Sequence, residues 1–130
     1  KKYKIGFPLN VLNIGGISNV TKTTKETDLS NAIIEARDIG PGNFLIDEWI
    51  RKNSNKKFDK EGQIGKSGKI NQLILNQAID NFNINHLDES IDVKDFDISF
   101  LKGLSLADGC ATITNFTAYL IAEGIKFFYN

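Results

Sequence analysis

Apolar and polar residues alternate along the first part of the chain, which is the period of β-strands. The pattern predicts strands over Lys4–Ile14 and Ile17–Thr23, and a third over Ala32–Ile39 after the polar segment KETDLSN. Gly15 and Gly16 separate the first two strands, and glycine suits a tight turn because it adopts positive φ without steric cost. The first part of the chain is therefore expected to form three sequential antiparallel strands.

The rest of the chain has the period of helices. A helix is predicted from Phe44 onward, with Asn43 in position to cap it, and further helices over Lys69–Phe82 and Ser105–Phe128. Between them, the polar segment KNSNKKFDKEGQIGKSGK is expected to run over the surface. The fold class is thus α/β, with helices packed on the sheet. The apolar positions expected in the core are Phe44, Leu45, Trp49 and Ile50 in the first helix, Ile70, Leu73, Ile74, Ala78 and Ile79 in the second, and Leu106, Cys110, Ile113, Thr117 and Leu120 in the third.

Composition narrows the class of protein. A chain of 130 residues that is 41% hydrophobic is typical of one globular domain. Its 16 basic and 16 acidic residues give no reason to expect a nucleic-acid or anionic-membrane partner, and no apolar run approaches the ~20 residues of a membrane span. The single Cys110 cannot form an internal disulfide, and no Cys/His cluster suits a metal, which favours the cytoplasm. The only histidine, His86, is expected in a surface loop.

Two glycine-rich segments could carry chemistry. Gly15–Gly16 is either a simple turn or a place where a phosphate oxygen approaches backbone N–H groups. In GPGN, Gly40 and Gly42 flank Pro41, and Asn43 begins a helix whose free N–H groups favour anions. If the strands are neighbours, both segments lie at one edge of the sheet and could bind one polyphosphate or one sugar. A turn followed by a helix cap is the equally weighted alternative.

Four segments occur in an order that resembles a known family. LNIGGISNVT, ARDIGPGNFLIDEW, FDKEGQIGKSG and ATITNFTAYLIA are similar to blocks of the anhydro-N-acetylmuramic acid kinases, bacterial sugar kinases of the actin and hexokinase superfamily. The resemblance implies a ribonuclease-H-like fold, and residues 1–130 as a single, incomplete domain similar to the C-terminal domain of these kinases. It also implies that ATP, with Mg²⁺, phosphorylates 1,6-anhydro-N-acetylmuramic acid at O6 while water opens the anhydro bridge, a step of peptidoglycan recycling.

The resemblance also implies roles for particular residues. Asn13, Gly15, Gly16 and Asn19 would bind the ATP phosphates, and Gly40, Pro41, Gly42 and Asn43 would lie beside the sugar. Asp38 would be the base that activates water, since a carboxylate can accept the proton and oppose the positive charge that develops on the sugar. Asp47, Asp59 and Lys66 also match family positions and are interpreted as structural. No residue of the chain is assigned to a metal.

Departures from the family pattern predict that the chain is inactive alone. The family's first glycine motif, the opposite wall of the cleft and the adenine loop have no counterpart in the sequence. HLDESID replaces an expected Pro-Lys-Ser stretch, and Arg37 replaces an aromatic residue. The expected partner is therefore a separate or missing N-terminal half of the kinase, and a homodimer stays open. A non-catalytic remnant or interaction module that keeps the fold is the alternative function.

Overall fold

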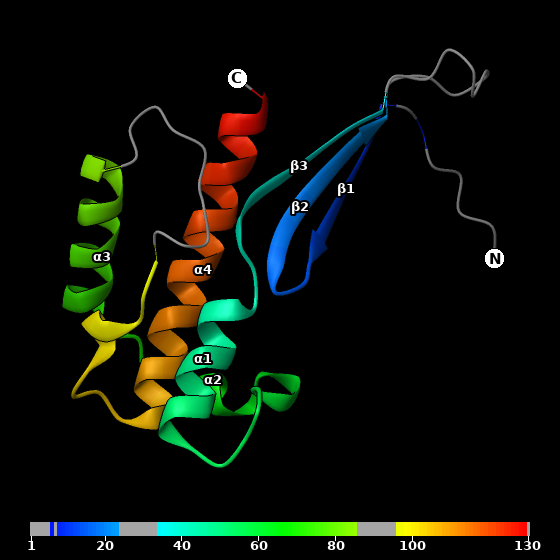
Figure 1. Ribbon diagram of the computed structural model, residues 1–130. Coiled ribbons are helices and arrows are strands. Elements are labelled where there is room, and N and C mark those ends of the chain that lie inside the picture. Colours follow the sequence, from blue (N-terminus) through cyan, green and yellow to red (C-terminus); the bar gives the residue numbers. More distant parts are fainter. Residues whose placement is uncertain (1–5, 7, 24–33, 86–95, 130) are drawn as a thin grey trace.

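A three-stranded antiparallel sheet lies beside a group of helices (Figure 1). The computed structural model describes residues 6, 8–23, 34–85 and 96–129. The strands follow one another in the order β1-β2-β3, with β1 at Leu9–Ile14, β2 at Ile17–Thr23 and β3 at Ile34–Pro41. The three predicted antiparallel strands are confirmed, although β1 begins at Leu9 and β3 continues past Ile39. The predicted starts of the first and third strands, at Lys4 and Ala32, lie outside the described residues, as does His86.

Four α-helices and two short 3₁₀ helices follow the sheet in the described parts of the chain. Their bounds are Phe44–Asn53 for α1, Lys60–Gly62 for η1, Gln63–Ser67 for α2, Gln72–Asn85 for α3, Ser99–Leu101 for η3 and Leu106–Tyr129 for α4. The three predicted helices are confirmed. None of the described helices combines the length and apolarity needed to cross a membrane.

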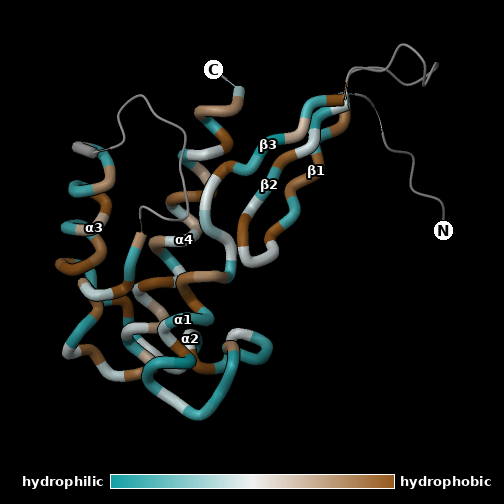
Figure 2. Tube along the Cα trace, viewed as in Figure 1, coloured by the Kyte–Doolittle hydropathy of each residue, from teal (hydrophilic) through white to brown (hydrophobic). Residues whose placement is uncertain are grey.

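The segment expected to be a surface loop between α1 and α3 is partly helical, so that prediction was incomplete. Figure 2 shows this segment in mainly hydrophilic colours, which is why the sequence suggested a loop. Local hydrogen bonds create its helix, because the Asp59 carboxylate accepts the backbone N–H of Ile64 at 2.8 Å and of Gly65 at 3.0 Å. An acidic group that satisfies the first N–H groups stabilises a helix start even in a polar segment.

Helix α4 is the centre of the hydrophobic core, and it packs against α1, α2, α3 and β3. Trp49 lies against Gly109 of α4, where a Cβ atom would overlap the indole ring. Its indole N–H donates to the carbonyl oxygen of Leu106 at 3.0 Å, so the prediction of a core tryptophan is confirmed. The buried core residues are Leu45, Trp49, Ile50, Leu75, Ala78, Phe82, Ile98, Leu101, Cys110, Ile113, Phe116 and Leu120.

The predicted apolar face was wrong in two places. Among the side chains of α3 that the structure describes, the buried ones are Leu75, Ala78 and Phe82, whereas Leu73 is 68% exposed. Ile70 precedes the first turn of α3 and is also exposed, because the helix begins at Gln72 rather than Lys69. In α1, Phe44 is exposed at 43% although the other three predicted core residues are buried. The spacing of apolar residues predicted the helices, but it did not predict which face of α1 or α3 packs against the core.

Candidate functional site

A row of three polar residues crosses the sheet near the turn between β1 and β2. Asn13 pairs with Asn19, and Asn19 pairs with Asp38 on the next strand. Residues directly opposite one another in antiparallel strands project from the same face of a sheet. Asn13 and Asp38 are exposed and Asn19 is partly exposed, and their side chains form no hydrogen bond to the described residues. The row therefore presents two amides and one carboxylate to solvent.

Packing against α4 identifies the face on which this row lies. Val20, next to Asn19, is buried, and the Arg37 guanidinium carbon lies 5.6 Å from the centre of the Phe128 ring of α4. These neighbours point toward α4, so the alternation along each strand turns Asn19 and Asp38 away from it. The row thus occupies the face of the sheet opposite α4.

A β-bulge follows Asp38 in β3. Ser18 pairs with Gly40 while Asn19 pairs with Asp38, which leaves Ile39 as the extra residue. Ile39 is buried, and a Cβ atom on Gly124 of α4 would lie 2.9 Å from its Cβ. Gly40 has φ of 147°, a backbone conformation that other residues rarely adopt. The bulge shifts the pairing of β3 by one residue directly after Asp38, so that Gly40 and Pro41 still pair with Ser18 and Ile17.

The two glycine segments touch each other. We call Gly15–Gly16 the glycine turn and Gly40–Asn43 the GPGN loop. The backbone N–H of Gly42 donates to Gly16 O at 2.9 Å, that of Asn43 to Gly15 O at 2.7 Å, and that of Phe44 to Gly16 O at 3.2 Å. The expectation that the segments meet at one edge of the sheet is therefore confirmed. The expectation of free N–H groups at the start of α1 was wrong for Asn43 and Phe44, because the carbonyls of the glycine turn occupy them.

The GPGN loop is a buried support for the glycine turn. A Cβ atom on Gly42 would overlap the carbonyl oxygen of Gly15 and lie 2.9 Å from Ser18 Oγ. The Ser18 hydroxyl in turn donates to the carbonyl oxygen of Pro41 at 3.2 Å. Asn43 is the exposed member of the loop; it occupies the N-cap position of α1 but makes no side-chain cap, and its amide donates to Ile14 O at 3.4 Å. The assignment of Gly40, Pro41, Gly42 and Asn43 to a sugar stays a prediction.

Gly16 presents a backbone donor to open space. Neither Gly15 nor Gly16 has positive φ, so the expectation that glycine suits this turn by adopting positive φ was wrong. The reason is that the strands already pair at Ile14 and Ser18, so the connection is wider than a two-residue turn. A Cβ atom on Gly16 would meet nothing within 4 Å, and the Gly16 N–H has no acceptor among the described residues. The fold therefore gives no reason for glycine at this position.

Asp59, by contrast, is fully engaged in structure. Besides the two N–H groups of α2, its carboxylate accepts the Cys110 thiol at 3.4 Å. Burial works against the charged form, but the hydrogen bonds outweigh it and lower the pKa of Asp59. Cys110 is buried, which confirms it as a core residue, and burial and the Asp59 carboxylate raise its pKa to about 12, which disfavours the thiolate. Lys66 is exposed on α2.

The pairing of Asn13 with Asn19 was not predicted from the sequence, although the spacing of the two residues around Gly16 indicates it. A hairpin centred on Gly16 places residues that are equally distant from it opposite each other, and these two asparagines are such a pair. Asp38 joins the same row through the register between β2 and β3, which no local pattern in the sequence predicted. Within the described residues, no group of three or more His, Cys, Asp and Glu side chains could hold a metal ion.

Comparison with known proteins gives one consistent family. The profile described as anhydro-N-acetylmuramic acid kinase matches residues 7–128. A protein named anhydro-N-acetylmuramic acid kinase from Pelagibacter ubique is 47% identical over 124 residues, which is 94% of this chain and 32% of that protein. Proteins with the same name from Zymomonas mobilis and Rhodopseudomonas palustris are 36% and 40% identical, over 93% and 88% of this chain and 32% and 30% of those proteins. The chain spans about a third of the length of these curated relatives.

Proposed function

The chain belongs to the anhydro-N-acetylmuramic acid kinase family, and we propose that it supplies one wall of the catalytic site of an ATP-dependent kinase. The substrate is 1,6-anhydro-N-acetylmuramic acid. In this reaction the oxygen of a water molecule bonds to C1 of the sugar as the bond between C1 and O6 breaks. O6 receives the γ-phosphoryl group of ATP, so the products are ADP and the 6-phosphorylated sugar. The proposed fold is that of the actin and hexokinase superfamily.

The observation that carries this proposal is the convergence of three kinds of group at one end of the sheet. The open N–H of Gly16 lies at the turn that joins the strands bearing Asn13 and Asn19. Backbone and amide N–H groups are suitable donors to phosphate oxygens, and the missing Cβ of Gly16 lets an oxygen approach closely. The same cross-strand row ends in a carboxylate, Asp38.

Asp38 is proposed as the base. Phosphoryl transfer itself needs mainly positioning and charge stabilisation, whereas ring opening needs a group that removes a proton from water. The Asp38 side chain is exposed and forms no hydrogen bond to the described residues, so its oxygens are open to a water molecule. Its negative charge would also oppose the positive charge that develops at C1. In this proposal the water proton moves to the Asp38 carboxylate.

The GPGN loop has an indirect role in the proposed site. Its N–H groups hold the carbonyls of the glycine turn, so they fix the direction of the Gly16 N–H rather than contacting an anion themselves. Asn43, the exposed member, is the residue of this loop proposed to reach the sugar. ATP is expected with Mg²⁺, but the described residues offer no cluster of ligands for an ion, so no step is assigned to it.

We expect the 130-residue chain to bind ATP only weakly by itself, with a cytoplasmic partner segment completing the site. Micromolar affinity corresponds to about −8 kcal/mol and requires a largely enclosed ligand, which one wall cannot provide. Isothermal titration of the chain with ATP should therefore give a dissociation constant in the millimolar range or weaker. A micromolar constant would contradict the assignment of this chain to a single wall.

The decisive test is Asp38→Asn in a full-length kinase that carries this segment. The amide keeps the shape of the side chain but removes the base, so turnover should fall by about two to four orders of magnitude while ATP affinity changes little. Glu35→Gln is the matched control, because it removes an exposed carboxylate from the same strand. Near-normal turnover in Asp38→Asn, or an equal loss of turnover in Glu35→Gln, would refute the assignment of Asp38 as the base. Release of phosphorylated sugar is the measured quantity.

A further inference from the structure

A cavity of about 390 Å³ lies next to the GPGN loop. Asn43 lines it from the start of α1, and Asp47 lines it from the next turn of the same helix. Phe58, Asp59 and Thr114 complete the part of the wall that matters for chemistry. Asn43 also bonds to Gly15 and Ile14 at the end of the hairpin, so it connects the wall of this cavity to the proposed phosphate site.

The polar groups of this wall differ in how far they are already used. Both carboxylate oxygens of Asp59 accept hydrogen bonds, and the Thr114 hydroxyl donates to the carbonyl oxygen of Cys110 at 2.7 Å. The Asp47 carboxylate and the Asn43 side-chain oxygen accept no hydrogen bond from the described residues. These two residues are four apart in sequence, so both project from one side of the start of α1. The cavity therefore holds two uncommitted acceptors beside each other.

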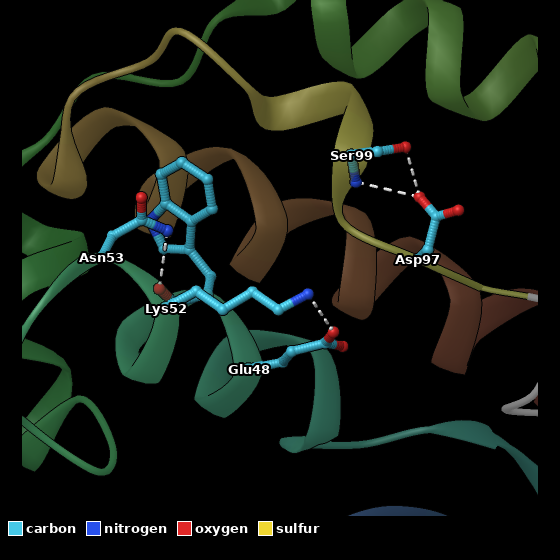
Figure 3. Close-up of polar contacts among 6 residues, drawn as sticks. Glu48, Lys52, Asn53, Asp97 and Ser99 are labelled. Atoms are coloured by element: carbon cyan, nitrogen blue, oxygen red, sulfur yellow. Dashed lines mark hydrogen bonds and ion pairs between the residues drawn. The ribbon is translucent and has the colours of Figure 1, made fainter.

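A second cavity, at the other end of α1, shows the contrast. It has a volume of about 470 Å³ and is lined by Lys52, Asn53, Asp97 and Ser99 among others. Figure 3 shows that Lys52 pairs with Glu48 at 2.9 Å, that Asn53 donates to the Trp49 carbonyl, and that Asp97 accepts the N–H and hydroxyl of Ser99. These four polar side chains are already paired or hydrogen-bonded, and the cavity carries no proposal.

Two features of the cavity beside the GPGN loop define its ligand. Phe58 is 55% exposed, and an open aromatic ring is a suitable surface for the C–H face of a sugar ring. No Lys or Arg lines the cavity among the described residues, and two carboxylates do, so phosphate and the lactyl carboxylate of a muramic acid are disfavoured there. The ligand group that suits this cavity is therefore uncharged and rich in O–H and N–H donors.

We propose that this cavity binds the hydroxyl and acetamido side of the sugar, with Asp47 as the acceptor that positions it and Phe58 as its apolar floor. The inference rests on the proposed function and adds the orientation of the substrate. The lactyl group then points away from α1, toward whatever wall faces it. Partial burial raises the pKa of Asp47, with Arg51 opposing this effect, so hydroxyl donors from a ligand would favour its charged form.

Asp47→Asn in a full-length kinase that carries this segment tests the positioning role. Loss of a charged hydrogen bond should raise the KM for the sugar by about 10- to 100-fold, while the KM for ATP stays within about twofold. Glu48→Gln is the control, because it removes the adjacent carboxylate, which pairs with Lys52 outside the cavity. Phe58→Leu should also raise the KM for the sugar. If Asp47→Asn does not fold, this second variant tests whether the cavity binds the sugar. An active kinase whose sugar KM is unchanged in these variants would overturn the inference.

A binding readout separates this inference from the proposed function. N-acetylglucosamine, which lacks the lactyl group, is titrated at millimolar concentrations into the 130-residue chain and followed by amide NMR shifts. Shifts at Asn43, Asp47 and Phe58 that are reduced in Asp47→Asn are the expected result. Such shifts in a protein whose full-length form phosphorylates no anhydro sugar would refute the proposed function and leave the cavity assignment intact. Shifts confined to other surfaces would refute the cavity assignment alone.

Discussion

Gly42 and Gly16 belong to touching segments, yet replacing each with alanine should have very unequal consequences for stability. At Gly42 a Cβ atom would overlap the carbonyl oxygen of Gly15 and crowd the hydroxyl of Ser18. Since backbone rather than a flexible side chain is in the way, the glycine turn and the GPGN loop must separate. At Gly16 a Cβ atom meets nothing within 4 Å and the backbone is not in the left-handed region.

The structure gives a magnitude for each change. Separation at Gly42 weakens three backbone hydrogen bonds, from Gly42, Asn43 and Phe44 to the carbonyls of the glycine turn. With a net contribution of about 0.5–1.5 kcal/mol each, Gly42→Ala should lower the free energy of unfolding by about 2–4 kcal/mol. Gly16→Ala should change it by no more than about 0.5 kcal/mol, or raise it slightly, because alanine restricts the unfolded chain.

Urea denaturation of the 130-residue chain, followed by circular dichroism, measures both values, and the slope m checks that the unfolding remains two-state. A second measurement, the affinity for ATP of a full-length kinase that carries this segment, tests the proposed phosphate contact at Gly16. Gly16→Ala should weaken ATP binding without loss of stability, since the methyl group occupies the space that a phosphate oxygen is proposed to use. Equal destabilisation by the two substitutions would refute the argument from the contacts, and unchanged ATP affinity in Gly16→Ala would remove the phosphate from this turn.

Three further predictions concern the core and its hydrogen bonds. Gly109→Ala should lower the free energy of unfolding by about 3 kcal/mol or more, because the new Cβ overlaps the Trp49 ring; the fluorescence of this single tryptophan reports the change. Asp59→Asn should lower it by about 1–2 kcal/mol at pH 7. Since the pKa of Asp59 is lowered by folding, its contribution is present above the ordinary value of 3.8 and is lost as the pH falls through the folded value, so the variant should show a flatter acid limb in pH-dependent denaturation. Cys110 should react with iodoacetamide at pH 8 at least about 100-fold more slowly in the folded chain than in urea; comparable rates would contradict its burial.

The sequence predicted the elements better than it predicted their contacts. Alternation and helical spacing depend on neighbours along the chain, so the three strands and the helices containing Trp49 and Cys110 were found. The face of α3 was misjudged because Leu73 and Leu75 are equally apolar, and only the position of α4 decides which of them is buried. Asp59 shows the complementary limit, since a carboxylate that starts a helix in a polar segment looks like any surface charge.

The candidate site illustrates the same limit at closer range. The meeting of the two glycine segments followed from strand order, which is local information. The hydrogen bonds between the two segments could not be predicted, because the sequence does not show that the carbonyls of Gly15 and Gly16 accept the N–H groups of Asn43 and Phe44. The bulge at Ile39 could not be predicted either, and this residue packs closely against Gly124 of a helix far along the chain.

The central place of α4 has a consequence for how this chain acquires its structure during synthesis. Every other main layer, namely β3, α1, α2 and α3, contacts residues between Leu106 and Tyr129, which leave the ribosome after all of them. The hairpin can pair early, but Trp49 and Ile39 cannot make their close contacts with α4 until Gly109 and Gly124 have emerged. Such dependence on distant contacts delays folding and leaves apolar surfaces exposed to chaperones in the meantime. Ribosome-stalled chains that end before Leu106 should accordingly remain protease-sensitive, and protection should appear in one step once most of α4 is outside the exit tunnel.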